Sequence, residues 1–127
     1  MIWLFRKVSP AMRRATLTGA TANLTANHRS RDHGDVHEHT WQITVWFETY
    51  NQTNALHLRS DLLNWIKRYE GKCLPDEIAW AEDMAKRIER DLTPDCDGYS
   101  GWMGRIHSVL IERHKEGLLA CVKDTSA

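Results

Sequence analysis

The segment from Val36 to Val45 restricts the possible folds of this chain most strongly, because it is a run rich in β-branched and aromatic residues that predicts a β-strand. His37 and His39 stand two positions apart at its start. Since side chains alternate faces along a strand, both imidazoles are expected on the same side of a sheet. The pattern therefore predicts two histidines fixed side by side.

A third histidine, His28, lies nine residues before His37. Three histidine ligands with one open coordination position describe a catalytic zinc site, so His28, His37 and His39 are the candidate metal ligands. A solvated loop at the entrance of a strand explains the same pattern, because a chain of 127 residues with seven histidines places some of them two apart by chance. The spacing alone leaves both interpretations open.

Length and charge limit the class of protein. The 127 residues fit one domain, and we expect it to span 1–127, with an N-terminal extension of about 1–13 and a C-terminal tail of about 123–127. The 17 basic and 17 acidic residues cancel, so no net field attracts nucleic acid or a membrane surface. No segment is long and apolar enough for a signal peptide or a membrane span.

The cysteines indicate the compartment. There are three of them, widely spaced and without a CxxC pattern. Such usage indicates reduced thiols, so we expect a cytoplasmic protein.

The hydrophobic pattern predicts the element order β-β-α-α-β-β. We expect two strands over about 14–28 and 37–50, which pair as an antiparallel hairpin with a long connection. A helix starts near Ser60 after a turn at 51–54, and a second helix spans about Pro75 to Leu92. Two further strands span about 106–112 and 118–122, after a loop at 95–104 and around a turn at 115–117.

Four motifs in this order resemble the family of 6-pyruvoyltetrahydropterin and 6-carboxytetrahydropterin synthases. That family typically shows an F-x-A-x-H strand, an H-G-H-x-Y strand, a T-A-E-N-L-A helix and a V-x-V-x-E strand. The corresponding segments here are Leu24–His28, His37–Trp41, Trp80–Ala85 and Val109–Glu112. The resemblance covers roughly residues 14 to 122.

The resemblance implies the α+β tunnelling fold (T-fold), a β-β-α-α-β-β subunit with a four-stranded antiparallel sheet covered by two helices. It implies that such subunits form a ring, as a homo-oligomeric trimer or hexamer, with pockets between subunits. Exposed sheet edges add a physical reason, since pairing around a barrel removes them. The whole chain is then a single T-fold domain.

The resemblance also implies a function and its residues. It suggests a zinc-dependent carbon–oxygen lyase that acts on a pterin such as dihydroneopterin triphosphate, in tetrahydropterin or queuosine biosynthesis. Zinc on the three histidines polarises the side-chain hydroxyls of the substrate. Glu112 and Glu82 would be the substrate-binding carboxylates, with Glu112 accepting N–H bonds from the amino-pyrimidine edge. Otherwise Glu112 is an exposed residue at a strand end.

The chain departs from the family at several catalytic positions. His33 stands where the family has a cysteine, and Glu70 and Gly71 replace its Asp-His pair. We therefore expect His33 as the catalytic base, with a loop residue and a fourth metal ligand as the alternatives.

Two more departures, Trp80 for threonine and Glu38 for glycine, lie next to the candidate pocket. One alternative function is a catalytically altered or inactive relative that keeps the metal and pterin pocket as a binding module. Another is a zinc hydrolase with a different small substrate, which is favoured if His33 and Glu38 both face the metal.

Overall fold

The computed structural model describes residues 17–29, 34–49, 52–93 and 104–123. Within these ranges the elements follow the predicted order, with one short 3₁₀ helix before the second α-helix. They are β1 (Leu17–Arg29), β2 (Val36–Thr49), α2 (Gln52–Tyr69), η2 (Asp76–Ile78), α3 (Ala81–Leu92), β3 (Gly104–Arg113) and β4 (Leu118–Lys123). The predicted loop at 95–104 lies outside the described residues, apart from Gly104, which begins β3.

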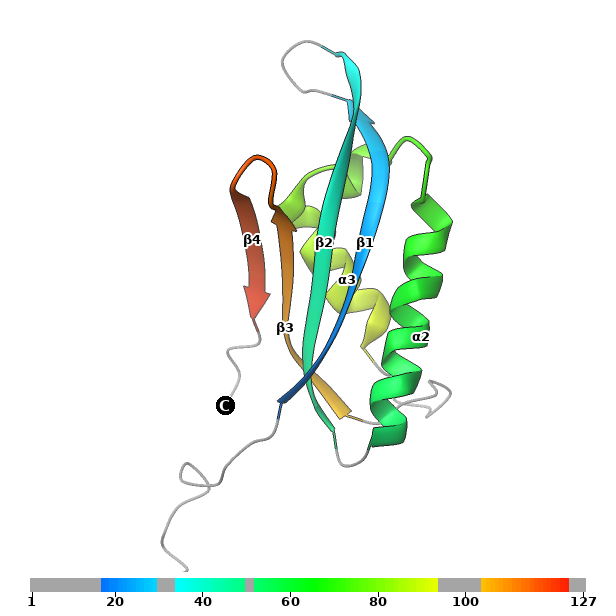
Figure 1. Cartoon of the computed structure of the whole chain (residues 1–127), viewed down its shortest axis with the longest axis vertical. Helices are drawn as coiled ribbons and strands as arrows, with labels where there is room; N and C mark the ends of the chain where they lie inside the picture. The colour runs from blue at the N-terminus through cyan, green and yellow to red at the C-terminus, as the bar shows by residue number, and fades with distance from the viewer. Residues whose placement is uncertain (1–16, 30–33, 50–51, 94–103, 124–127) are drawn as a thin grey trace, which may run out of the picture.

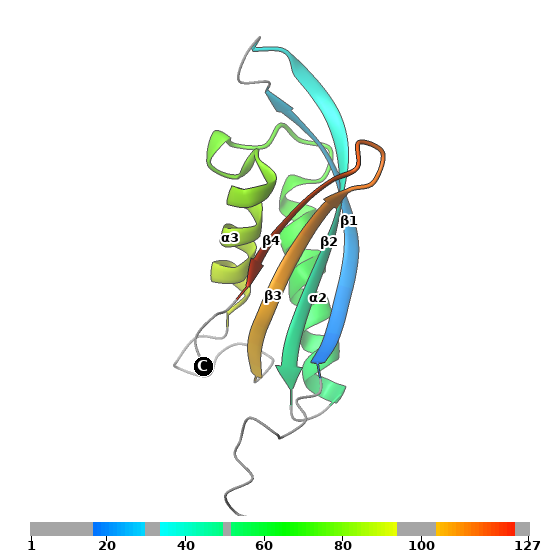
Figure 2. The same ribbon diagram turned by 90° about the vertical axis from the view of Figure 1, so that its left-hand side faces the viewer.

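The strands form one antiparallel sheet in the order β1-β2-β3-β4. Both long helices lie on the same side of this sheet, as Figure 2 shows, with α2 against β1 and α3 against β3 and β4. β1 and β2 extend as a hairpin beyond the helices (Figure 1). The structure confirms the predicted α+β arrangement of a four-stranded sheet covered by two helices.

The core lies between the sheet and the helices. Alternate residues of β2 from Trp41 to Phe47 are buried, and the intervening ones point to the other face. On α2 the buried residues are those that the helical period predicts, and on α3 they include Ala85 and Ile88. The largest fully buried side chains are Trp41, Trp65, Phe47, Leu24, Ile43, Leu58, Leu62, Ile78, Met84, Ile88 and Ile111.

The first helix begins earlier than predicted. α2 starts at Gln52, so the predicted turn at 51–54 and the start near Ser60 were wrong. Leu58 is fully buried one turn before Leu62, so the apolar stripe of the helix already includes a residue that lies before the predicted start. The tertiary contact of this stripe outweighs the weak local signal.

The second predicted helix is interrupted. The expected span from Pro75 to Leu92 divides into η2 and α3, because Trp80 has an extended backbone with φ −110° and ψ 145°. The carbonyl of Ala79 consequently lies outside α3, whose first backbone bond is accepted by the oxygen of Trp80. This break leaves the Ala79 oxygen available to another partner.

The connection after α2 is attached to the outer edge of β1. Gly71 donates to the Thr25 oxygen at 2.8 Å, Asn27 donates to the Lys72 oxygen at 2.9 Å, and Leu74 donates to the Asn27 oxygen at 2.7 Å. Gly71 adopts a positive φ of 73°, which glycine tolerates best. These bonds hold the chain entering η2 beside the end of β1 that carries His28.

None of the helices in the described ranges combines the length and apolarity needed to cross a membrane.

The packing of α2 supplies a test of the fold. Leu62 is fully buried in the core, whereas Leu56 on the same helix is 71% exposed. We expect Leu62→Ala to lower the free energy of unfolding by about 2–5 kcal/mol, as large-to-small core substitutions do. Leu56→Ala, the matched control, should change it by less than about 0.5 kcal/mol. Urea denaturation followed by circular dichroism measures both, and similar losses in the two variants would contradict this packing.

Candidate metal centre

Three histidine side chains converge on the helix-covered side of the sheet, near the end of the β1–β2 hairpin. The ring centroids of His28, His37 and His39 lie 4.5, 4.7 and 4.6 Å apart, which is close to an equilateral triangle. One ligand nitrogen from each ring lies within 4.8 Å of the others. The structure therefore brings together the three residues that the sequence pattern selected.

Strand geometry places these rings. His37 and His39 share the face of β2 that buries Trp41, and His28 is the direct cross-strand partner of His37. The three rings differ in accessibility, since His28 is 2% exposed, His39 is half-buried and His37 is exposed. The cluster is therefore enclosed by the protein at His28 and accessible to solvent at His37.

The hydrogen bonds of His28 select its tautomer. Its Nδ1 lies 2.9 Å from the carbonyl oxygen of Ala79, which only accepts, so Nδ1 carries the hydrogen. Its Nε2 then holds a lone pair and lies 2.9 Å from Nε2 of His37. A histidine ligand whose second nitrogen donates to a carbonyl is the usual arrangement in metal sites. The break between η2 and α3 therefore supplies the outer support for a ligand nitrogen.

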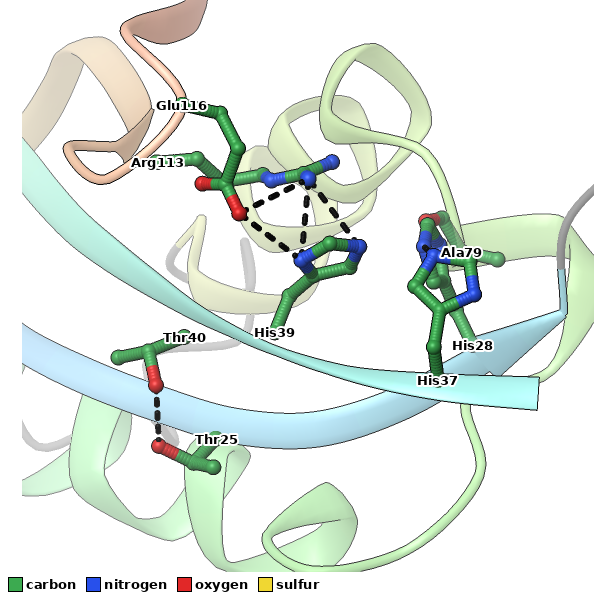
Figure 3. Close-up of polar contacts among 8 residues, drawn as sticks. All are labelled: Thr25, His28, His37, His39, Thr40, Ala79, Arg113 and Glu116. Carbon is green, nitrogen blue, oxygen red and sulfur yellow. Dashed lines mark hydrogen bonds and ion pairs between the residues drawn. The ribbon is translucent and has the colours of Figure 1, made fainter.

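His39 has a charged surrounding (Figure 3). Its Nδ1 lies 3.2 Å from the Glu116 carboxylate, and Nη2 of Arg113 lies 3.0 Å from Nδ1 and 3.1 Å from Nε2. Arg113 also contacts the same Glu116 oxygen at 3.3 Å. A neutral imidazole has one lone pair, so Nδ1–H donating to Glu116 leaves Nε2 as the acceptor for Arg113.

The surroundings favour the neutral form of two of the rings. Burial lowers the pKa of His28 below 6.5, although the bond to the Ala79 carbonyl opposes the shift, and the charges of His37 and Arg113 lower it further. Burial also lowers the pKa of His39, and Arg113 adds to the effect while Glu116 opposes it. A hydrogen bond from Arg113 is the main reason that the pKa of Glu116 is lowered. Neutral imidazole is the form that binds metals.

The donor set fits a metal ion. Three imidazole nitrogens with one open side match the ligand type and number of catalytic zinc sites. Ligand atoms about 2.1 Å from a tetrahedral ion lie roughly 3.4 Å from one another, so small side-chain rotations bring these rings to the required spacing. A shallow pocket of about 170 Å³ adjoins His39 and is lined by Glu38, His39, Thr40, Lys115 and Glu116. The arrangement can hold a divalent cation and leave room for a small ligand.

The other predicted site residues lie elsewhere. Glu112 pairs with Gln42 in the β2–β3 register, which places it on the sheet face opposite to that of Ile43 and the histidines. Its carboxylate lies 3.8 Å from Nε2 of His114. Glu82 is exposed in the first turn of α3. Within one chain these two carboxylates do not join the three imidazoles.

Two further predictions concern residues around the ligands. The candidate base His33 lies outside the described residues. Glu38 lies between His37 and His39 on β2, so strand alternation directs its side chain away from the imidazoles. The hydrolase alternative, which Glu38 at the metal would favour, therefore has no support from the position of this residue.

Arg113 and Glu116 were missed as candidate site residues. Arg113 alternates with Ile111 and Val109 on the inner face of β3, and that pattern is visible in the sequence. Its approach to His39 depends on the pairing of β3 with β2, which the sequence pattern did not specify. Glu116 reaches the site from the turn after β3 and had no comparable signal.

Comparisons with known proteins agree with the fold. No protein-family model matches the sequence, and no curated protein matches it. Eleven chains of solved structures match, among them 6-pyruvoyl tetrahydropterin synthase from Caenorhabditis elegans. That structure has a TM-score of 0.64 and 13% sequence identity, and the match covers 88% of this chain and 97% of that one. At this identity the likeness shows the fold, and it confirms the predicted T-fold subunit.

The geometry predicts that the protein binds one zinc ion per chain. We expect His37→Ala to weaken zinc binding by more than about 100-fold, because changes to outer residues alone cost 10–100-fold. His37 is exposed, so the fold should survive the change. His57→Ala, on the exposed side of α2, is the control and should bind zinc as the wild type does. Elemental analysis and competition with a chromophoric chelator measure both, and equal binding by the two variants would argue against the site.

The lowered pKa values predict a pH dependence for the metal-free protein. Below pH 6.5 the unfolded chain binds more protons at these positions than the folded one does, so folding weakens as the pH falls from 6.5 through the lowered pKa values of His28 and His39. We expect the free energy of unfolding of the wild type to decrease over this range. The decrease should be smaller in His39→Gln, because one of the two titrating imidazoles is absent. Urea denaturation at several pH values measures the slopes. His57→Gln is the control, and a slope for His39→Gln as steep as that of the wild type would refute the assignment.

Proposed function

We propose that this protein is a zinc-dependent enzyme that acts on a pterin, in the manner of a 6-pyruvoyl- or 6-carboxytetrahydropterin synthase. Its substrate would be dihydroneopterin triphosphate or a related reduced pterin, in tetrahydropterin or queuosine biosynthesis. The observation that carries the proposal is the convergence of His28, His37 and His39 on a fold like that of a solved 6-pyruvoyl tetrahydropterin synthase.

The three histidines would hold the zinc ion. When bound, zinc supplies a Lewis acid that lowers the pKa of hydroxyl groups on the substrate side chain. The bond from His28 to the Ala79 carbonyl keeps the lone pair of Nε2 directed at the ion. The Glu116 carboxylate gives the same kind of support to His39.

The substrate-binding carboxylates need a pocket between copies of the chain. Glu112 lies on the sheet face opposite to the histidines, which directs it away from a ligand held by the metal of its own chain. We propose a ring, a trimer or a hexamer, in which Glu112 and Glu82 contact a pterin beside the metal of another copy. The outer edges of the sheet, on β4 and on the part of β1 that the segment after α2 does not cover, favour this assembly, because unpaired edges tend to pair.

His33 is the proposed general base. Its position four residues before His37 corresponds to the cysteine of the family motif. An imidazole accepts protons near neutral pH, so it can replace a thiolate in this role.

The second candidate is a relative that binds metal and pterin without turnover. The missing cysteine and Asp-His pair of the family favour this alternative.

Turnover of dihydroneopterin triphosphate tests the proposal. We expect the zinc-loaded protein to consume this compound, with product followed by liquid chromatography. His37→Ala should lose nearly all activity because it removes a metal ligand, and His33→Ala should lower kcat by about 10²–10⁴-fold because it removes the base.

The outcomes separate the candidates. Pterin binding without turnover would favour the silent relative, and neither binding nor turnover would refute both. Unchanged activity in His33→Ala would overturn the base assignment alone. His57→Ala, far from the cluster on α2, is the control for nonspecific loss.

A further inference from the structure

We propose that Arg113 makes the metal centre an anion-binding site, in which its guanidinium and the bound metal share one carboxylate or phosphate oxygen of the ligand. The inference rests on the proposed metal role and adds the chemical class of the group that meets the open coordination position. It assigns the specificity for an anionic ligand group to Arg113, which is not one of the three histidines.

Arg113 is held in the site by its strand. It follows Ile111 on the inner face of β3, and its side chain is 15% exposed. Figure 3 shows its guanidinium reaching over His39, with Glu116 on the side of the β3–β4 turn. A cation fixed this close to a ligand nitrogen acts on any charge that enters the centre.

The charges of the site favour an anion. Three neutral imidazoles and a divalent ion would carry two positive charges. Among the described side chains in contact with Arg113, Glu116 offsets its positive charge, so the net charge of the loaded centre would stay positive. A ligand oxygen with a negative charge would therefore be favoured over a neutral one.

The guanidinium also has an unused donor. Its Nε is buried and has no hydrogen-bond partner among the described residues. A buried N–H without an acceptor is costly, and arginine forms its strongest bonds with two oxygens of a carboxylate or phosphate. An anionic ligand would supply the acceptor that the described part of the protein does not.

Arg113 and the metal compete for the same atom. Nη2 of Arg113 lies 3.0 Å from Nδ1 and 3.1 Å from Nε2 of His39, and Glu116 contacts Nδ1, so the tautomer with Nδ1–H directed at Glu116 leaves Nε2 to accept from Arg113 or to bind a metal. A metal bound at Nε2 would therefore replace the contact of the Arg113 guanidinium with that nitrogen. It follows that Arg113 lowers affinity for the cation and raises affinity for the anion.

These opposite effects define the experiment. Cobalt(II) replaces zinc as the probe, and its visible absorption reports the binding of the metal and then of acetate or inorganic phosphate. Relative to the wild type, we expect Arg113→Gln to bind cobalt about 3- to 30-fold more tightly and the anion at least about 10-fold more weakly. Arg113→Lys keeps the charge but not the paired donors, and should recover part of the anion affinity.

Arg29→Gln is the matched control. It removes the same charge beside His28, but Arg29 is exposed and alternation places it on the other face of β1. Its affinities for cobalt and for both anions should stay within about twofold of the wild type, since exposed charges are well screened.

The outcomes are distinct. Unchanged anion binding in Arg113→Gln, an equal loss in Arg29→Gln, or a joint fall of cobalt and anion affinity in Arg113→Gln would overturn the inference. A wild type that binds no cobalt would refute the metal role and the inference together. Cobalt and anion binding without pterin turnover would refute only the proposed reaction. The tighter of the two anions identifies the ligand group as carboxylate or phosphate.

Discussion

The register of the β1–β2 hairpin determines the candidate site. Cross-strand pairing places His28 opposite His37 and Ala26 opposite His39. A shift of one residue would turn the histidines of one strand to the other face of the sheet, together with the buried residues that follow them. The residues that stabilise the core, such as Leu24 and Trp41, therefore also keep the imidazoles together. The same strand register therefore determines both the packing of the core and the position of the three imidazoles.

The sequence predicted the features that depend on periodicity within one segment. The two alternating strands, the apolar faces of both helices and the pair His37 and His39 belong to this class, whereas His28 lies on another strand and was supported by the family resemblance. The prediction was wrong where a distant contact decides the backbone. A helix from Pro75 to Leu92 satisfies local propensity, but the extended Trp80 interrupts it and leaves the Ala79 oxygen for His28, more than fifty residues away. The early start of α2 has the same kind of cause. Leu58, which lies before the predicted start, is buried in the core.

The limits of the site prediction have a physical reason as well. The family resemblance selected Glu112 as the carboxylate for the amino-pyrimidine edge of a pterin, and the β2–β3 register places the next residue, Arg113, on the inner face with the histidines. Strand parity decides which of two neighbouring residues meets the histidines, and parity between strands cannot be read from either strand alone. A basic residue that the motif comparison did not select therefore lies beside His39, and it changes the expected charge of the site.

The combination of a deep and an exposed ligand has a consequence for metal binding. His28 is buried and its tautomer is set by Ala79, whereas His37 is exposed and has no comparable support among the described residues. A metal entering from solvent would meet His37 first and reach His28 only by replacing the bond between their Nε2 atoms. His37 must then give up the hydrogen on Nε2 or present its other nitrogen, because His28 cannot change tautomer without losing its bond to the carbonyl. His28 would thus define the position of the ion, and His37 would change its tautomer or its orientation to bind it.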